Sequence, residues 1–249
     1  DEAIRIDPQD ANTYNGRGLA YGSLGQYERA IQDYNEAIRL NPKDADAYYN
    51  RGAAYGVLGK YELEIQNYDE AIRLNPQYAD AYYNRGAAYG DLGQYEQAIA
   101  DYGEAIRLNP QDADAYYNRG IAYRHLGQYE RAIQAYNEAI RLNPQDTDAY
   151  NNRGLAYGSL GEYERALQDL DEAIRLDPQN AKAYYNKGLS YHSLDRYDKA
   201  IQDLNEAIRL DPQWASAYYR RGVAHKRLSQ HDKANADLKR ACELESLYC

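Results

Sequence analysis

Asparagine and tyrosine side chains recur side by side at one place in a 34-residue pattern. The asparagine file consists of Asn50, Asn84, Asn118, Asn152 and Asn186. The tyrosine file consists of Tyr49, Tyr83, Tyr117, Tyr185 and Tyr219. A carboxamide offers both a donor and an acceptor, so the asparagine file has the chemistry to hold a peptide backbone without reading its side chains. Neighbouring tyrosines add rigid contact area at low entropic cost.

A structural role is the alternative for both files. The asparagines then bond neighbouring repeats, and the tyrosines fill the wall that the repeats form. The two roles are compatible, and the residue types alone leave both open.

Positive charge gathers at the carboxyl end of a chain whose net charge is -10. Residues 215–249 carry 7 basic and 4 acidic side chains. Five cationic or titratable residues fall at places that face the same side as the asparagine file: Lys182, His192, Arg220, Lys226 and Arg227. We expect them to form a site for an acidic peptide, with an affinity that falls as salt is added.

No set of residues has the spacing of a catalytic or metal site. The four histidines occupy different places in the repeat and lack metal-ligand spacing: His125, His192, His225 and His231. The serines have no histidine partner at a suitable place, and there is no glycine-rich phosphate loop. We therefore expect no enzyme activity, no metal and no cofactor.

The period itself predicts the architecture that positions these residues. The seven prolines stand 34 residues apart, at Pro8, Pro42, Pro76, Pro110, Pro144, Pro178 and Pro212. A fixed period of this length is typical of stacked small units. We expect a single array over residues 11–248, in repeats 11–44, 45–78, 79–112, 113–146, 147–180, 181–214 and 215–248. Residues 1–10 match the end of a repeat, and we interpret them as the remnant of a preceding second helix in a longer protein.

Each repeat has two helical patterns that are separated by a turn. In the repeat 79–112 we expect a first helix over 81–92, a turn at Gly93 and a second helix over 96–108 that ends before Pro110. Asp112 and its counterparts are suited to cap the next helix. Glycine and alanine on the facing sides of the two helices allow close approach, and tyrosines fill the space beside them.

The residues with these roles carry a family resemblance: Tyr82, Gly86, Tyr89, Ala98, Tyr102, Ala105 and Pro110. Their pattern resembles the tetratricopeptide repeat, with tyrosine in place of the family's usual tryptophan and phenylalanine. The resemblance implies an all-α fold, a right-handed α-α superhelix built as a solenoid of antiparallel helix pairs. In this family the first helices form an inner wall that typically binds an extended peptide.

The resemblance also bears on the two candidate sites. The asparagine file resembles the asparagine ladder in the repeat domain of O-linked N-acetylglucosamine transferases, although nothing here matches a sugar-transferring domain. Some tetratricopeptide domains clamp a partner's terminal carboxylates, and Asn186 and Arg220 match two places of that clamp. Asn151, Leu155 and Ser216 depart from it, so a generic acidic-peptide site is favoured.

These observations favour a protein-interaction module whose partner is a protein or a peptide. The alternatives are a substrate-recruiting arm of a larger enzyme, and a structural spacer. The acidic balance argues against nucleic acid, and no apolar run is long enough to insert in a membrane. We expect weak self-association at the amino end. Cys242 and Cys249 lie seven residues apart, one on an expected helix and the other at the last residue, so we expect no bridge or metal pair between them. A reducing compartment and a cytoplasmic location follow as expectations.

Further expectations concern charged residues and the two ends. Cations at one place in the first helices, named here the seam cations, are Arg17, Arg51, Arg85, Arg119, Arg153, Lys187 and Arg221. We expect carboxylates such as Asp101 and Glu104 to pair with them, because a buried unpaired charge is destabilising. Glu64 replaces a small residue between helices, so it should reach solvent, find a cation or loosen its repeat, and a side chain that reaches solvent is favoured. Ile4 and Ile6 should anchor the first residues, and a final helix over 232–246 should cap the array by itself.

Overall fold

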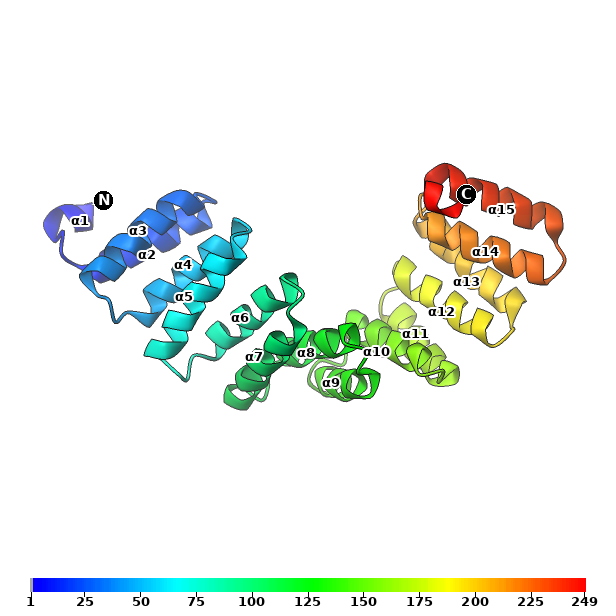
Figure 1. Ribbon diagram of the computed structural model, residues 1–249, viewed down its shortest axis with the longest axis horizontal. Coiled ribbons are helices and arrows are strands. Elements are labelled where there is room, and N and C mark those ends of the chain that lie inside the picture. The colour runs from blue at the N-terminus through cyan, green and yellow to red at the C-terminus, as the bar shows by residue number, and fades with distance from the viewer. Residues whose placement is uncertain (1) are drawn as a thin grey trace. The chain divides into compact units, whose positions relative to one another are not determined.

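The computed structural model describes residues 2–249, apart from the side chains of Ala3 and Ile4. The described residues form helices and turns and contain no strand (Figure 1). They divide into two compact units, Asp1–Leu126 and Gly127–Cys249, named here the amino-terminal and carboxyl-terminal units. None of the described helices is both long and apolar enough to cross a bilayer.

The amino-terminal unit contains eight helices among its described residues. They are α1 (Glu2–Ile6), α2 (Ala11–Ser23), α3 (Tyr27–Leu40), α4 (Ala45–Val57), α5 (Tyr61–Leu74), α6 (Ala79–Asp91), α7 (Tyr95–Leu108) and α8 (Ala113–His125). Helices α2 and α3, α4 and α5, and α6 and α7 pack as pairs, and each second helix also packs on the next first helix. The helices predicted over 81–92 and 96–108 are α6 and α7.

The carboxyl-terminal unit repeats the same arrangement. Its elements are α9 (Tyr129–Leu142), α10 (Thr147–Ser159), α11 (Tyr163–Leu176), α12 (Ala181–Ser193), α13 (Tyr197–Leu210), α14 (Ala215–Arg227), α15 (His231–Leu244) and a 3-10 turn, η1 (Ser246–Tyr248). The all-helical, helix-pair fold is therefore confirmed. The expected grouping of residues 11–248 as one array stays a prediction.

Small residues let the two helices of a pair come close. Ala98 on α7 has no exposed surface, and a Cβ added to Gly86 on α6 would lie 3.1 Å from the Tyr102 ring and 3.3 Å from the Ala98 carbonyl oxygen. Asp112 Oδ1 accepts a hydrogen bond from the Ala115 amide at 3.0 Å, as a capping residue does. The expected roles of glycine, alanine and the aspartate cap are confirmed.

The turn inside each pair needs a left-handed residue. Gly93 has a φ of 71°, whereas the last two turns use Asp195 and Ser229, each at 57°. A side chain in this region costs about 1–2 kcal/mol, which glycine avoids at some cost in unfolded-state entropy. Ser229→Gly should therefore raise the free energy of unfolding by about 0.5–1 kcal/mol, measured by urea denaturation. Ser23→Gly, at the last residue of α2, is the control and should lower it, because it also removes the hydrogen bond of the Ser23 hydroxyl to the Leu19 carbonyl oxygen.

Both chain ends differ from expectation. The Ile6 side chain is 74% exposed, so its predicted role as an anchor is wrong. The Ile4 side chain lies outside the described residues. Helix α15 ends at Leu244, and the tail turns back through η1, so that Tyr248 lies 5.0 Å from the Tyr219 ring and 2.8 Å from the Ser216 hydroxyl. The tail thus covers α14 together with α15, and the prediction that α15 caps alone is wrong.

A disulfide joins Cys242 to Cys249, whose Cα atoms lie 4.7 Å apart. The prediction of no bridge is therefore wrong. Its reason was that Cys242 is helical and Cys249 is terminal, but the turn back at η1 brings the two together. Bridges of this kind persist in oxidising surroundings. The cysteines no longer support a reducing compartment, and the cytoplasmic location stays a prediction.

Aspartates pair with five of the seam cations, as expected. Arg85 donates to both carboxylate oxygens of Asp101 at 2.6 and 2.7 Å and to Asp69 at 2.5 Å. Arg17, Arg153, Lys187 and Arg221 meet the aspartate at the corresponding place: Asp33, Asp169, Asp203 and Asp237. Arg51 meets amide oxygens instead. Glu104 was a wrong candidate, because it pairs with Arg107 on its own helix.

Glu64 is buried, with 8% of its surface exposed, so the expectation that it reaches solvent is wrong. Its carboxyl lies over Gly56, where an added Cβ would come within 2.5 Å of Oε1. The Tyr68 hydroxyl donates a hydrogen bond to it. Burial raises the pKa of Glu64 to about 7, and the nearby charge of Asp91 adds to this shift. The absent side chain at Gly56 is what makes room for the carboxyl.

Candidate functional site

Within each unit, asparagines of the file link a first helix to the first helix of the preceding repeat. In the amino-terminal unit, Asn84 Nδ2 on α6 donates to the Tyr49 hydroxyl on α4 at 2.8 Å. Asn118 on α8 donates to the Tyr83 hydroxyl on α6, also at 2.8 Å. Asn50 donates to Asn15 Oδ1 at 3.0 Å. Each of these bonds spans 35 residues, one repeat plus one position.

The same link occurs in the carboxyl-terminal unit with a different acceptor. Asn186 on α12 donates to Asn151 Oδ1 on α10 at 2.8 Å, and both side chains are buried. Asn152 donates to the Asp148 carbonyl oxygen of its own helix at 3.0 Å. Asn151 and Asn15 were missed by the sequence reasoning. The 35-residue spacing to an asparagine of the file was the signal that would have found them.

The amide donors of Asn50, Asn84, Asn118 and Asn186 therefore hold neighbouring repeats together, which is the structural alternative left open by the sequence. Each bond uses one of the two N–H groups of its amide and leaves the carbonyl oxygen outside this link. A donor fixed in this way also fixes the orientation of the whole carboxamide. Within each unit, the asparagines that bond the preceding repeat are therefore oriented amides along the first helices.

The tyrosine file packs between repeats. Tyr49 lies 5.6 Å from the Tyr68 ring and stacks on Tyr78 at 4.8 Å. Tyr185 stacks on Trp214 at 4.5 Å, in the same relation four repeats later. Burial raises the pKa values of Tyr49 and Tyr83. Tyr117 occupies the corresponding place on α8. These side chains build the wall and leave only part of their surface to solvent.

A hollow opens beside the asparagine file in each unit. In the amino-terminal unit it has a volume of about 310 Å³ and is lined by residues of α6, α7 and α8: Ala87, Gly90, Asp91, Tyr95, Ala98, Tyr102, Asn118, Ile121, Ala122 and His125. Tyr95 and His125 stack face to face across it at 4.5 Å. His125, which lacks the spacing of a metal ligand, is therefore part of the wall of this hollow.

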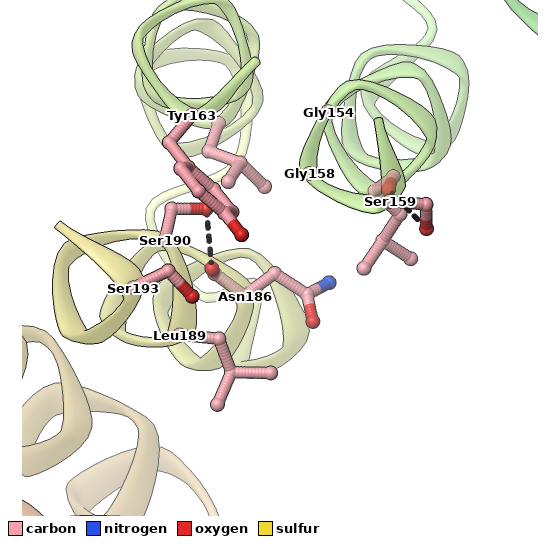
Figure 2. A pocket seen from close by; sticks show the side chains of 10 residues that line it. Gly154, Gly158, Ser159, Tyr163, Asn186, Leu189, Ser190 and Ser193 are labelled. Carbon is pink, nitrogen blue, oxygen red and sulfur yellow. Dashed lines mark hydrogen bonds between the residues drawn. The ribbon is translucent and has the colours of Figure 1, made fainter. Parts of the chain in front are cut away.

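The hollow of the carboxyl-terminal unit lies at the same place in the repeat, 68 residues later. It measures about 240 Å³ and is lined by Gly154, Leu155, Gly158, Ser159, Tyr163, Leu170, Asn186, Leu189, Ser190 and Ser193. Figure 2 shows Asn186, Leu189 and Ser193 on one helix, facing Gly158 and Ser159 on another. The Ser190 hydroxyl donates to the backbone carbonyl oxygen of Asn186 at 3.0 Å. We name this hollow and the one in the amino-terminal unit the groove hollows.

The five residues predicted to bind an acidic peptide lie only partly close together. Burial, followed by the charges of Arg220 and Arg227, lowers the pKa of His192, whose buried Nε2 has no hydrogen-bond partner among the described residues. Lys226 and Arg227 line a hollow of about 560 Å³ with Val223. Lys182 is exposed on α12, and no described contact joins it to the other four. Among the described residues, no group of three or more His, Cys, Asp and Glu is placed to hold a metal.

Solved structures with the same helix-pair fold include three of note. YrrB, described as a tetratricopeptide repeat protein with an unusual peptide-binding site, is 28% identical, with a TM-score of 0.68 over 75% of this chain and 96% of that one. MamA from Desulfovibrio magneticus RS-1 is 25% identical, with a TM-score of 0.65 over 68% and 96%. A tetratricopeptide repeat protein from Parabacteroides merdae is 20% identical, with a TM-score of 0.73 over 94% and 93%, which bears on the fold alone.

No curated protein matches this sequence. Family models give a direct assignment. One described as a tetratricopeptide repeat matches residues 83–147 and 151–215, and a second matches residues 21–59 and 57–93. Two more match residues 1–32 and 215–246. Together with the helix pairs, the close approach at Gly86 and the left-handed turns, these matches show that the chain belongs to the tetratricopeptide repeat family.

Proposed function

We propose that this chain is a protein-interaction module that binds an extended segment of a partner along its first helices. The observation that carries the proposal is the pair of groove hollows, which occupy the same place in the repeat and each lie beside an asparagine of the file. Hollows that recur at the same place in the repeat, each beside an oriented amide, suit an extended chain, because the side chains and backbone groups of an extended chain also recur at a regular spacing. The peptide-binding site named for YrrB supports the same reading.

The hydrogen-bonding role of the asparagines follows from their orientation. An amide whose N–H is held by the preceding repeat offers its carbonyl oxygen in a fixed direction, so little rotamer entropy is lost when a peptide N–H binds. Side chains of the bound segment enter the groove hollows. Selectivity then comes mainly from the lining, which is aromatic at Tyr95 and His125 and hydroxylic at Ser159, Ser190 and Ser193.

At the carboxyl-terminal repeats the bound segment is acidic. Arg220 and Arg227 both influence His192, and Lys226 lines the adjacent hollow. Arg220, Lys226 and Arg227 are exposed, so contact with a carboxylate requires no burial of an unpaired charge. The weak self-association expected at the amino end has support in the exposed side chains of Ile6, Leu19 and Leu24.

Filling the groove hollows tests the proposal. A Cβ added at Gly90 or Gly158 meets nothing within 4 Å, and each glycine lines one of the hollows. We therefore expect the leucines of Gly90→Leu/Gly158→Leu to occupy the two hollows. Peptides are first selected from a displayed random library on the wild-type chain, and their dissociation constants are then measured by calorimetry. We expect the double variant to weaken binding at least tenfold, or about 1.4 kcal/mol.

Ala100→Leu/Gln168→Leu is the matched control, because it adds the same side chain at two exposed positions of second helices. It should bind the selected peptides as the wild type does. Circular dichroism at the binding temperature establishes that all variants are folded. Unchanged affinity in the groove variant would favour the structural spacer, since a spacer is insensitive to changes in the wall.

A further inference from the structure

Two neighbouring repeats of the amino-terminal unit present the same wall to the groove. Helices α4 and α6 have the same sequence up to their last residue, ADAYYNRGAAYG. A tyrosine of the following helix packs on each of them in the same way. The Tyr68 ring would lie 3.0 Å from a Cβ added at Gly52, and the Tyr102 ring would lie 3.1 Å from a Cβ added at Gly86. The two repeats can therefore be compared residue by residue.

The second helices differ at the residue that faces this wall. Helix α5 carries Glu64 where α7 carries Ala98. The Glu64 carboxyl lies over Gly56 and accepts a hydrogen bond from the Tyr68 hydroxyl. At Gly90, the corresponding glycine of α6, an added Cβ would meet nothing within 4 Å. Since Gly90 and Ala98 both line the hollow of the amino-terminal unit, this hollow includes the space that Glu64 fills in the preceding repeat.

The hollow offers a hydroxyl and a carboxylate to a side chain from outside. Tyr102, which corresponds to Tyr68, lines the hollow, and its hydroxyl forms no hydrogen bond among the described residues. Burial raises the pKa of Tyr102, and the charges of Tyr83 and Asp91 add to the shift, so the Asp91 carboxylate lies near this hydroxyl. Asp91 and His125 also line the hollow and are exposed, so it can be entered from solvent.

A primary carboxamide matches this hydroxyl and this carboxylate. Its carbonyl oxygen accepts from a hydroxyl, as the Glu64 carboxyl does from Tyr68, and its N–H groups donate to a carboxylate. Glutamine is the uncharged counterpart of the glutamate that fills the preceding repeat. We propose that the hollow between α6 and α8 binds a glutamine side chain of the partner segment, with Tyr102 as the donor and Asp91 as the acceptor. This proposal rests on the proposed groove function and names the side chain that this hollow selects.

Other side chains suit the hollow less well. A glutamate from outside is ionised at neutral pH, and Asp91 repels it. A lysine is attracted to Asp91 but has no acceptor for the Tyr102 hydroxyl, and a leucine can bond neither group. The hollow of the carboxyl-terminal unit holds Leu170 and Ser159 at the corresponding places. It lacks this hydroxyl and this carboxylate, so it should not share the preference for glutamine.

The test follows the Ala98 methyl resonance in protein labelled with ¹³C-methyl alanine, assigned through Ala98→Ser. The probes are the N-acetyl methylamides of glutamine, glutamate, lysine and leucine, titrated at pH 7.5 and equal ionic strength. We expect the glutamine compound to give a saturating shift, and the other three to have dissociation constants at least tenfold higher. The methyl of Ala166, the counterpart of Ala98 in the carboxyl-terminal unit, should not move.

Two variants test the assigned contacts. Tyr102→Phe removes only the hydroxyl and should weaken the glutamine compound about two- to tenfold. Tyr163→Phe, at the hollow of the carboxyl-terminal unit, is the matched control and should leave its affinity unchanged. Ala98→Gln supplies a carboxamide from the chain itself, as Glu64 supplies its carboxyl. In this variant the Ala87 methyl, which also lines the hollow, should no longer respond to the glutamine compound.

The proposal is overturned if the glutamine compound does not move the Ala98 methyl, if another probe binds as tightly, or if Tyr102→Phe binds like the wild type. Library-selected peptides that bind the groove in the presence of any of these results leave the groove function standing. Conversely, if the glutamine compound binds as expected but Gly90→Leu/Gly158→Leu leaves peptide affinity unchanged, the groove function fails while the carboxamide preference of the hollow holds.

Discussion

Arg85→Leu should lower the free energy of unfolding by about 3–5 kcal/mol, because it leaves a buried carboxylate without its cation. Asp101 is 5% exposed, and its carboxylate accepts two hydrogen bonds from the Arg85 guanidinium. Burial already raises the pKa of Asp101, and Arg85 opposes that shift. Once the arginine is gone, nothing offsets burial and the nearby charges of Asp69 and Glu104, all of which raise the pKa of Asp101. Urea denaturation followed by circular dichroism measures the loss.

Two comparisons separate the stranded charge from the lost packing of the arginine stem. Arg85→Leu/Asp101→Leu removes both charges and should recover most of the loss, since an apolar pair of similar volume replaces a buried ion pair at little cost. Arg119→Leu removes the same stem where the residues 16 positions before and after are Gly103 and Ala135, so no carboxylate is left behind. It should change the free energy of unfolding by less than about 1 kcal/mol. Equal losses in Arg85→Leu and Arg119→Leu would contradict this account of the seam.

Glu64→Gln should remove a dependence of stability on pH that amounts to roughly 3 kcal/mol. The pKa of Glu64 is about 7 in the folded chain and 4.5 when it is unperturbed. Below pH 4.5 both states hold the proton, and the carboxyl costs nothing. As pH rises from 4.5 to 7, the unfolded chain releases its proton while the folded chain keeps it, so stability falls. Above pH 7 the loss is constant.

The measurement is the free energy of unfolding of the wild type and Glu64→Gln between pH 4 and pH 8. The difference between them should grow in favour of the variant as pH rises from 4.5 to about 7 and then stay level, because glutamine does not ionise. Glu62→Gln is the control, since it lies at an exposed position of the same helix, and its offset from the wild type should stay within about 0.5 kcal/mol. A constant offset for Glu64→Gln would show that the carboxyl is not held in its neutral form.

Periodicity predicted whatever depends on packing within one repeat. The helix pair of repeat 79–112, the glycine contact at Gly86, the cap at Asp112 and the Arg85–Asp101 pair all follow from residues that recur with the same neighbours. These features recur because the residues that form each contact recur at the same spacing, so the sequence pattern identifies both partners of the contact.

The failures concern single departures from the period. The fate of Glu64 depends on Gly56 across the helix pair, which the position of Glu64 alone does not reveal. The Cys242–Cys249 bridge depends on where α15 stops, and helix ends are the least certain part of a pattern. The bonds of the asparagine file depend on an acceptor 35 residues away, which is tyrosine in some repeats and asparagine in others.

The central claim is that a partner segment lies along the asparagine file. The side-chain amide resonances of ¹⁵N-asparagine-labelled protein test it most directly, with a peptide selected on the wild-type chain as the ligand. The resonances of Asn84, Asn118 and Asn186 should shift on binding, while those of Asn109 and Asn143, in the turns after second helices, should not. Shifts confined to Asn109 and Asn143 would contradict the claim.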